Sequence, residues 1–272
     1  MSIFEAIFLG IVQGLTEFLP VSSSGHLVLF RQIFGINEPP LLFDSMVHVG
    51  TLVAVFAVLW KDVLGLLKKP IQPMMLYLII GTVPAVVAGL LFTDWLEAAF
   101  ETGRFIGFAF LGTAALLVTA ELLSRRAQRQ APGEPGKMNW LDALAVGLCQ
   151  AVAVIPGLSR SGATMSGALS RGLDRDLAAR FSFLLSIPII LGAAVFQLRN
   201  IGDSAAGGVA ATGGIGPAQI AAGSLTAALV GFFAVRLMLK IIREKSLFGF
   251  AVYTGILGFL VILDQTALHL VF

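Results

Sequence analysis

Six long apolar runs are the feature that most narrows the fold of this 272-residue chain. Each is close to the length of about 20 apolar residues with which a helix crosses a bilayer. Hydrophobic residues make up 57% of the chain and charged residues only 12%, about half the charged fraction of a soluble domain. The runs therefore predict an all-α polytopic membrane protein with six full spans, near residues 43–60, 74–92, 105–123, 177–198, 218–240 and 247–264.

Charge and cysteine content exclude several other classes of protein. The formal net charge of +2 is too small to indicate a nucleic-acid partner. The single cysteine, Cys149, lies in an apolar segment, so neither a disulfide framework nor a cysteine metal site is expected. The N-terminus has no basic region and no small-residue cleavage site, which predicts that no signal peptide is removed.

The distribution of charge between the spans predicts the topology. Basic residues concentrate in the loops 61–69, 124–138, 171–176 and 240–246, while 93–104 is acidic and 199–217 is nearly uncharged. Basic loops normally lie on the cytoplasmic side of a membrane. Both termini are therefore expected on the outer side.

An internal repeat divides the chain into two halves. Residues 10–26 align with 147–163 without a gap, and 81–89 (GTVPAVVAG) resembles 223–231 (GSLTAALVG). Five aligned pairs are identical: Gly10/Gly147, Gln13/Gln150, Ser22/Ser159, Ser24/Ser161 and Gly25/Gly162. The sequence thus predicts one membrane domain, with repeat one at 1–124, a linker at 125–138 and repeat two at 139–272.

Each half is expected to contain a re-entrant helical hairpin as well as three spans. A short apolar segment breaks at Pro20 in the first half and at Pro156 in the second, and a second short segment follows. Irregular backbone at membrane depth is tolerated only when it is buried in protein or lines a wet cavity. Because three spans are an odd number, the two repeats should have inverted topology and their hairpin tips should meet near the midplane.

The two predicted tips carry polar groups of the kinds that bind phosphate and transfer protons. The first tip offers Gln13, Glu17, Ser22, Ser23, Ser24, Gly25 and His26, and the second offers Ser159, Arg160, Ser161, Gly162 and Thr164. Guanidinium groups, hydroxyls and helix N-termini bind phosphate. A histidine and a glutamate add the capacity to move protons or to hold a divalent cation. If the tips face each other, they form one small phosphate-binding site.

Structural roles compete with these functional ones. Serine and glycine at helix breaks commonly serve as caps and close-packing residues. Arg160 could form an ion pair with Glu17 or extend to the inner interface, and Gln13 and Gln150 could join helix to helix. His48 and Asp44 begin a span, where an interfacial role and a functional role are equally compatible with the sequence.

The two motifs together resemble the undecaprenyl-pyrophosphate phosphatases of the bacterial cytoplasmic membrane, also called bacitracin-resistance proteins. The resemblance covers the whole chain and rests on Gln13-x-x-x-Glu17 with Pro20-Val-Ser-Ser-Ser-Gly-His26, and on Pro156-Gly-Leu-Ser-Arg-Ser-Gly-Ala-Thr164. It implies hydrolysis of undecaprenyl pyrophosphate to undecaprenyl phosphate and phosphate on the outer side of the membrane. The resemblance also implies that Mg²⁺ or Ca²⁺ assists, and that the lipid carrier is thereby recycled for cell-wall synthesis.

Carried over by position, the resemblance implies roles for five residues. Glu17 and Gln13 match the family's Glu/Gln-x-x-x-Glu pair, with Glu17 the expected cation ligand. Ser23 and His26 match the proposed nucleophile and acid–base group, and Arg160 matches the arginine that binds pyrophosphate. The chain departs from its relatives in two places. It has Tyr253-Thr254 where some relatives have Tyr-Arg, so a role for that arginine is not carried over. Gln13 stands where other members have an acid, which weakens the case for a metal site with two carboxylate ligands.

Several alternatives stay open at the level of sequence. Ser23, His26 and a water molecule all qualify as the nucleophile. A transporter or flippase of an anionic polyprenyl lipid would also use inverted repeats and a midplane arginine, but it has little need of a serine and a histidine beside a carboxylate. The small-residue segment 223–231 could pack within the chain or form a homodimer.

Overall fold

The computed structural model describes residues 1–36, 41–93, 95–96, 103, 105–130, 138–203 and 215–272. Within these ranges the chain is helical and contains no strand. The helices are α1 (Ile3–Thr16), α2 (Ser23–Phe34), α3 (Leu41–Val58), α4 (Trp60–Lys68), α5 (Pro73–Leu91), α7 (Ile106–Gln130), α8 (Trp140–Val152), α9 (Arg160–Ser170), α10 (Arg175–Asp203), α12 (Pro217–Glu244) and α13 (Phe248–Leu263), followed by a π-helical turn, Asp264–Leu268.

Five of the described helices are long and apolar enough to cross a membrane. The number rises to six if α3 and α4, which meet at an 80° bend, are counted as one span. The all-α, multi-pass class predicted from the apolar runs is therefore confirmed. The helices also reach beyond the runs, since α7 continues to Gln130.

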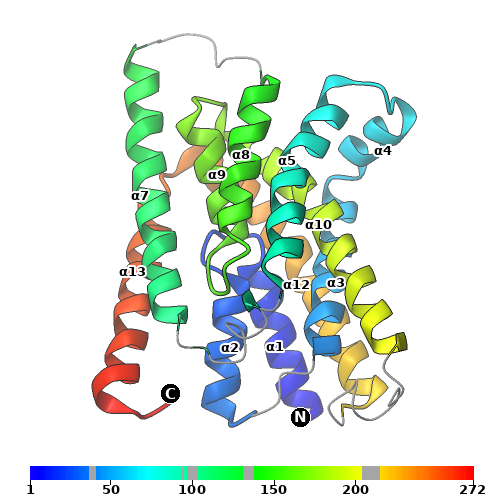
Figure 1. The fold of residues 1–272 in the computed structure, drawn as a ribbon, viewed down its shortest axis with the longest axis vertical. Helices are drawn as coiled ribbons and strands as arrows, with labels where there is room; N and C mark the ends of the chain where they lie inside the picture. Colours follow the sequence, from blue (N-terminus) through cyan, green and yellow to red (C-terminus); the bar gives the residue numbers. More distant parts are fainter. Residues whose placement is uncertain (37–40, 94, 97–102, 104, 131–137, 204–214) are drawn as a thin grey trace.

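The two short helix pairs enter the bundle from opposite ends (Figure 1). Helices α1 and α2 extend inward from the end where both termini lie, and α8 and α9 extend inward from the other end. Both first helices begin with a capping box, in which Ser2 pairs with Glu5 and Asn139 with Asp142. The tips of the two hairpins meet inside the bundle.

Close glycine contacts hold each hairpin against a long helix of the other half. A Cβ on Gly147 of α8 would lie only 2.7 Å from the carbonyl oxygen of Gly81 in α5. In the same way, Gly10 of α1 lies directly against the backbone of Gly223 in α12. Only glycine allows backbones to approach this closely.

The small-residue segment 223–231 therefore packs within the chain. A Cβ on Gly223 would lie 2.6 Å from the Phe43 ring, and one on Gly231 would lie 3.2 Å from the Ala54 Cβ and from the Phe18 ring. These neighbours belong to α3 and to the first tip. The glycine face of the segment is thus packed inside the chain, while Leu225 and Leu229 are 71% and 63% exposed.

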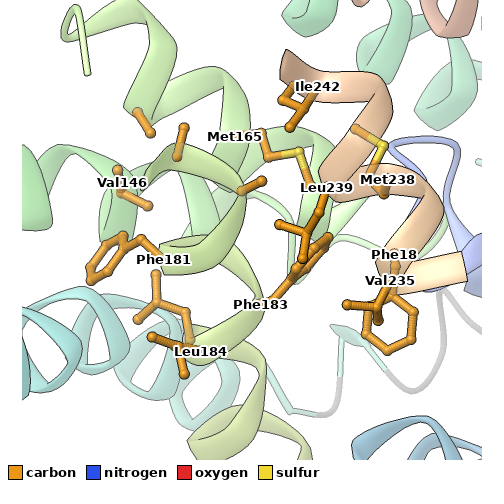
Figure 2. Close-up of a cluster of buried hydrophobic side chains, with 14 of the residues drawn as sticks. Phe18, Val146, Met165, Phe181, Phe183, Leu184, Val235, Met238, Leu239 and Ile242 are labelled. Carbon is orange, nitrogen blue, oxygen red and sulfur yellow. The ribbon is translucent and has the colours of Figure 1, made fainter. Parts of the chain in front are cut away.

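A buried apolar cluster anchors the first tip to the second half of the molecule (Figure 2). Phe18, next to Glu17, is fully buried and contacts Phe183 of α10 edge to face, with ring centroids 5.5 Å apart. The cluster continues through α8, α9, α10 and α12, with Val146, Met165, Phe181, Leu184, Val235, Met238, Leu239 and Ile242. A large buried aromatic side chain fixes the backbone beside it, so the position of Glu17 is set by this core.

Parts of the predicted loops lie outside the described residues. The first six residues of the expected linker 125–138 continue α7, and 131–137 are not described. The charges of the expected acidic loop, Asp94, Glu97, Glu101 and Arg104, also fall outside the described ranges.

Candidate active site

Three polar contacts join the two hairpin tips to each other. Ser161 Oγ donates a hydrogen bond to the carbonyl oxygen of Leu19 at 3.1 Å. The backbone N–H of Gly157 donates to Ser24 Oγ at 3.3 Å. Arg160 Nη2 binds Glu17 Oε1 at 2.5 Å. The predicted meeting of the tips is therefore present, and Ser24 and Ser161 contribute to it.

The aligned serines Ser22 and Ser159 cap the second helix of each hairpin. Ser22 Oγ accepts from the N–H of Gly25 at 3.2 Å, and Ser159 Oγ accepts from the N–H of Gly162 at 3.0 Å. Ser22 has a φ of 73°, a left-handed conformation that is strained for a residue with a side chain. Serine at a helix break thus serves as a cap, as expected in general, and these two serines fix where α2 and α9 begin.

Glu17 is the centre of the site and is only 6% exposed. Its Oε2 accepts a hydrogen bond from Ser23 Oγ at 2.6 Å and another from Gln13 Nε2 at 3.0 Å. Its Oε1 accepts the Arg160 bond. His48 Nε2 lies 3.5 Å from Oε2. A buried carboxylate needs such partners to stay ionised, and here they come from both hairpins and from α3.

Arg160 begins α9 and has one further contact. Its Nη1 donates to the carbonyl oxygen of Ser182 in α10 at 3.2 Å, and its side chain is 15% exposed. Thr164 supports this arrangement, because its hydroxyl donates to the Arg160 carbonyl at 2.9 Å and lies 2.6 Å from Ser182 Oγ. The ion pair with Glu17 raised as a structural alternative exists, and it lies inside the predicted site.

His26 is buried one turn into α2, and both of its ring nitrogens are engaged. Nδ1 lies 2.6 Å from the Ser22 carbonyl oxygen, and Nε2 lies 2.7 Å from the Tyr253 hydroxyl. The Tyr253 ring stacks on it at 5.7 Å, and Phe110 contacts it edge to face at 5.2 Å. Among the described contacts, none joins His26 to Glu17, Ser23 or Arg160.

The two aligned glutamines serve different purposes. Gln13 Nε2 bonds to Glu17 within α1, whereas Gln150 Nε2 bonds to the carbonyl oxygen of Gly81 in α5 at 3.1 Å. The helix-to-helix role therefore holds for Gln150. Gln13 belongs to the site.

The sequence did not predict some residues that contact the site. Tyr253, Ser182 and Thr113, which accepts from the Ser159 N–H at 3.1 Å, were not predicted. For Ser182 and Thr113 the only available signal was a lone hydroxyl in an apolar run, which usually bonds to its own helix. Tyr253 stood out only as part of the pair Tyr253-Thr254. His48 was left undecided, and the structure brings it to Glu17.

The oxygen donors at the first tip fit a hard divalent cation only in part. Gln13 Oε1 is buried without a hydrogen-bond partner, one turn from the Glu17 carboxylate. The described residues include no group of three or more His, Cys, Asp or Glu side chains that could hold a metal ion. Mg²⁺ and Ca²⁺ take six or more oxygen ligands, so most would have to come from a bound phosphate group and water.

Comparison with known proteins identifies the family of the chain. The model of the bacitracin resistance protein BacA family matches residues 6–260. An undecaprenyl-diphosphatase of Carboxydothermus hydrogenoformans is 46% identical, covering 98% of this chain and 99% of its own length. Undecaprenyl-diphosphatase 4 of Bacillus thuringiensis is 43% identical and an undecaprenyl-diphosphatase of Halothermothrix orenii is 41% identical, each over 97% of this chain and 98% of its own length. Similarity of this extent over both chains shows that the protein belongs to the bacitracin resistance protein BacA family.

Proposed function

We propose that this protein hydrolyses undecaprenyl diphosphate to undecaprenyl phosphate and inorganic phosphate within a bacterial membrane. One observation carries the proposal: Glu17 binds the Ser23 hydroxyl at 2.6 Å with one oxygen and the Arg160 guanidinium at 2.5 Å with the other. An anion-binding group and a hydroxyl beside a proton acceptor are thereby joined at one buried point. Relatives that are 43–46% identical over nearly the whole chain are named undecaprenyl-diphosphatase.

The proposed reaction depends mainly on positioning and charge, as phosphoryl transfer generally does. Arg160 exchanges Glu17 for the terminal phosphate and holds it beside the start of α2. Ser23 Oγ, or a water molecule in its place, attacks the terminal phosphorus, and its proton passes to Glu17. The bond from that phosphorus to the bridging oxygen breaks, and the electron pair leaves with undecaprenyl phosphate. Water then attacks the phosphorus of any phosphoserine and its protons leave with phosphate; as the bond from phosphorus to Ser23 Oγ breaks, Glu17 returns its proton to Ser23.

A divalent cation is proposed to accompany the diphosphate. Glu17 and the unpartnered amide oxygen of Gln13 would hold it on the protein side. When bound, it would neutralise part of the diphosphate charge. Ser22, Ser24, Ser159, Ser161, Gly25, Gly162 and Thr164 are assigned to shaping the binding site, because their contacts fix the two tips. Tyr253 is proposed to orient His26, because its hydroxyl lies 2.7 Å from His26 Nε2.

We also propose that the two halves are inverted repeats, with three spans in each and both termini on the outer side of the cytoplasmic membrane. The support is that aligned residues make equivalent contacts: Gly10 with Gly223 and Gly147 with Gly81. In a Cys149→Ala background, a membrane-impermeant maleimide added to spheroplasts should label Ser2→Cys but not Lys245→Cys. Labelling of Lys245→Cys alone would reverse the orientation.

The alternative function, transport of an anionic polyprenyl lipid, would use Arg160 in the same way. It gives no reason for a hydroxyl held 2.6 Å from a buried carboxylate. That contact favours the phosphatase.

Phosphate release from undecaprenyl diphosphate by the purified protein in detergent with Mg²⁺ tests the proposal. Arg160→Ala should reduce kcat/KM on the order of 10²–10³-fold, the loss typical of removing a group that stabilises transition-state charge. Arg126→Ala, at an exposed position on α7, is the matched control and should retain activity. No release by a folded parent protein would remove the phosphatase proposal and leave transport to be tested.

A further inference from the structure

The last two turns of α12 carry basic side chains on the exposed face of the helix. Arg236 and Lys240, called here the α12 cation pair, lie one turn apart and are both exposed. Leu225, Leu229 and Phe233 continue the same face toward the start of the helix, and they are 71%, 63% and 60% exposed. This face of α12 is therefore apolar over most of its length and cationic near its end.

Arg236 lies where the apolar part of α12 ends. From Pro217, where the helix begins, to Arg236 the rise is about 29 Å, at about 1.5 Å per residue. This length is close to the thickness of the hydrocarbon core of a bilayer, roughly 30 Å. The α12 cation pair therefore lies at the level of the lipid headgroup phosphates.

The guanidinium of Arg236 folds back over Phe232, one turn closer to the middle of the span. Its Cζ lies 5.2 Å from the centroid of that ring. An aromatic face attracts a cation, but it does not accept the fork of N–H groups with which a guanidinium binds two phosphate oxygens. In the described part of the chain these N–H groups have no hydrogen-bond or ion-pair partner. They remain available to an anion at this depth.

Nearby acidic side chains bind other arginines instead. Arg180 binds Asp62 and Asp176, each at 2.8 Å. Arg243 binds the other oxygen of Asp176 at 2.6 Å. Glu244, on the last turn of α12, has no described contact with the α12 cation pair. The charge of the pair is therefore not balanced by any described carboxylate in contact with it.

We propose that the α12 cation pair binds the phosphate of an anionic phospholipid whose acyl chain lies along the apolar face of the same helix. Arg236 would hold two phosphate oxygens, Lys240 would add a second positive charge, and Phe233 would contact the acyl chain. A free phosphate ion matches the two cations but not the apolar face. A zwitterionic phospholipid carries an ammonium group that offsets its phosphate. Charge and shape together favour a phospholipid of net negative charge.

The experiment measures the binding of phosphatidylglycerol to the full chain in a neutral detergent by native mass spectrometry. Arg236→Gln/Lys240→Gln is compared with Lys68→Gln/Lys69→Gln, which removes the same charge from exposed positions at the end of α4. Each cation near an anionic lipid contributes about a fivefold change in affinity, so the α12 variant should bind about 10- to 30-fold more weakly and the α4 control within about threefold of the parent. Phosphatidylcholine should bind to all three proteins equally.

A loss confined to the α12 variant and to phosphatidylglycerol supports the inference. Equal losses in the two double variants would overturn it, because net charge alone would then explain the binding. It would also be overturned if the parent bound phosphatidylcholine as tightly, or if excess inorganic phosphate displaced the lipid. If the α12 double variant does not fold, Lys240→Gln decides: binding about fivefold weaker supports the inference, and unchanged binding overturns it. No substrate is present in this assay, so its result is independent of the proposed function.

Discussion

The carboxylate of Glu17 contacts other polar groups of the candidate site. Glu17 is buried, and it is contacted by a guanidinium, a hydroxyl and an amide at once. These contacts tie the Ser23 hydroxyl to a proton acceptor before any substrate arrives. In such pre-organised sites, positioning supplies a large part of the rate enhancement.

Ser23→Ala tests whether that hydroxyl is the nucleophile. We expect kcat to fall about 10³-fold or more, because Ser23 supplies the only hydroxyl on the first tip that donates to Glu17 Oε2. Ser24→Ala is the matched control. It removes one hydrogen bond to the Gly157 N–H and should reduce activity far less. Near-full turnover by Ser23→Ala would exclude a covalent serine intermediate and favour attack by water.

The sequence predicted most of the polar residues that the structure brings together at the two tips, but not the partners of each. Glu17, Ser23 and Arg160 were predicted because ionisable groups and hydroxyls at helix breaks are costly in a membrane. The bond between His26 and Tyr253 joins positions 227 residues apart, and nothing local predicts it. The contact of His48 with Glu17 depends on how α3 packs beside α1, which the periodicity of one helix does not specify.

At the scale of elements, the N-terminal end of α2 packs closely against α7. A Cβ on Gly25 would lie 2.7 Å from Cζ of Phe110, the ring that also contacts His26. The N-terminus of α2 therefore sits where it does because position 25 has no side chain. Ser23 and His26 share this helix, so any shift of α2 moves both.

Gly25→Ala should consequently reduce both stability and activity. Overpacking of this kind typically costs about 1–3 kcal/mol of unfolding free energy. We expect a lower Tm in detergent and a reduced kcat, and partial recovery of both in the double variant Gly25→Ala/Phe110→Leu. Gly89→Ala in α5 is the control, since a Cβ there meets no atom within 4 Å. Unchanged activity in Gly25→Ala would show that α2 adapts without displacing Ser23.

At the scale of the whole molecule, the apolar runs predicted every long described helix, because a segment of this composition has no other stable state in a bilayer. The bend between α3 and α4 was not predicted, since no proline or glycine marks it in the sequence. The internal repeat anticipated the meeting of the two tips. It did not reveal that glycines from opposite halves form the helix contacts, because a small residue does not identify its partner.

The end of the bundle opposite the termini is held by a buried ion pair, which carries the last prediction. Glu121 of α7 is 1% exposed, and both of its oxygens lie 2.8 Å from Arg175 Nη2 of α10. It also accepts from Arg125 Nε at 3.0 Å and from the N–H of Leu247 at 3.1 Å, between α12 and α13. One carboxylate thus joins three parts of the chain at the end where the basic loops lie.

Removing one partner of a buried pair leaves the other charge without compensation, which typically costs about 3–5 kcal/mol. Glu121→Ala should therefore lower the free energy of unfolding by about that amount, measured by denaturation in mixed micelles. Arg243→Ala is the comparison, because its bond to Asp176 involves a side chain that is 53% exposed, and such pairs contribute about 0–1 kcal/mol. The folded fraction of Glu121→Ala should retain the parent kcat, since Glu121 has no contact with the hairpin tips among its described bonds. If Glu121→Ala and Arg243→Ala lost the same unfolding free energy, burial would not determine how strongly the Glu121 contacts stabilise the protein. A change in the kcat of Glu121→Ala would mean that this end of the bundle is coupled to the site.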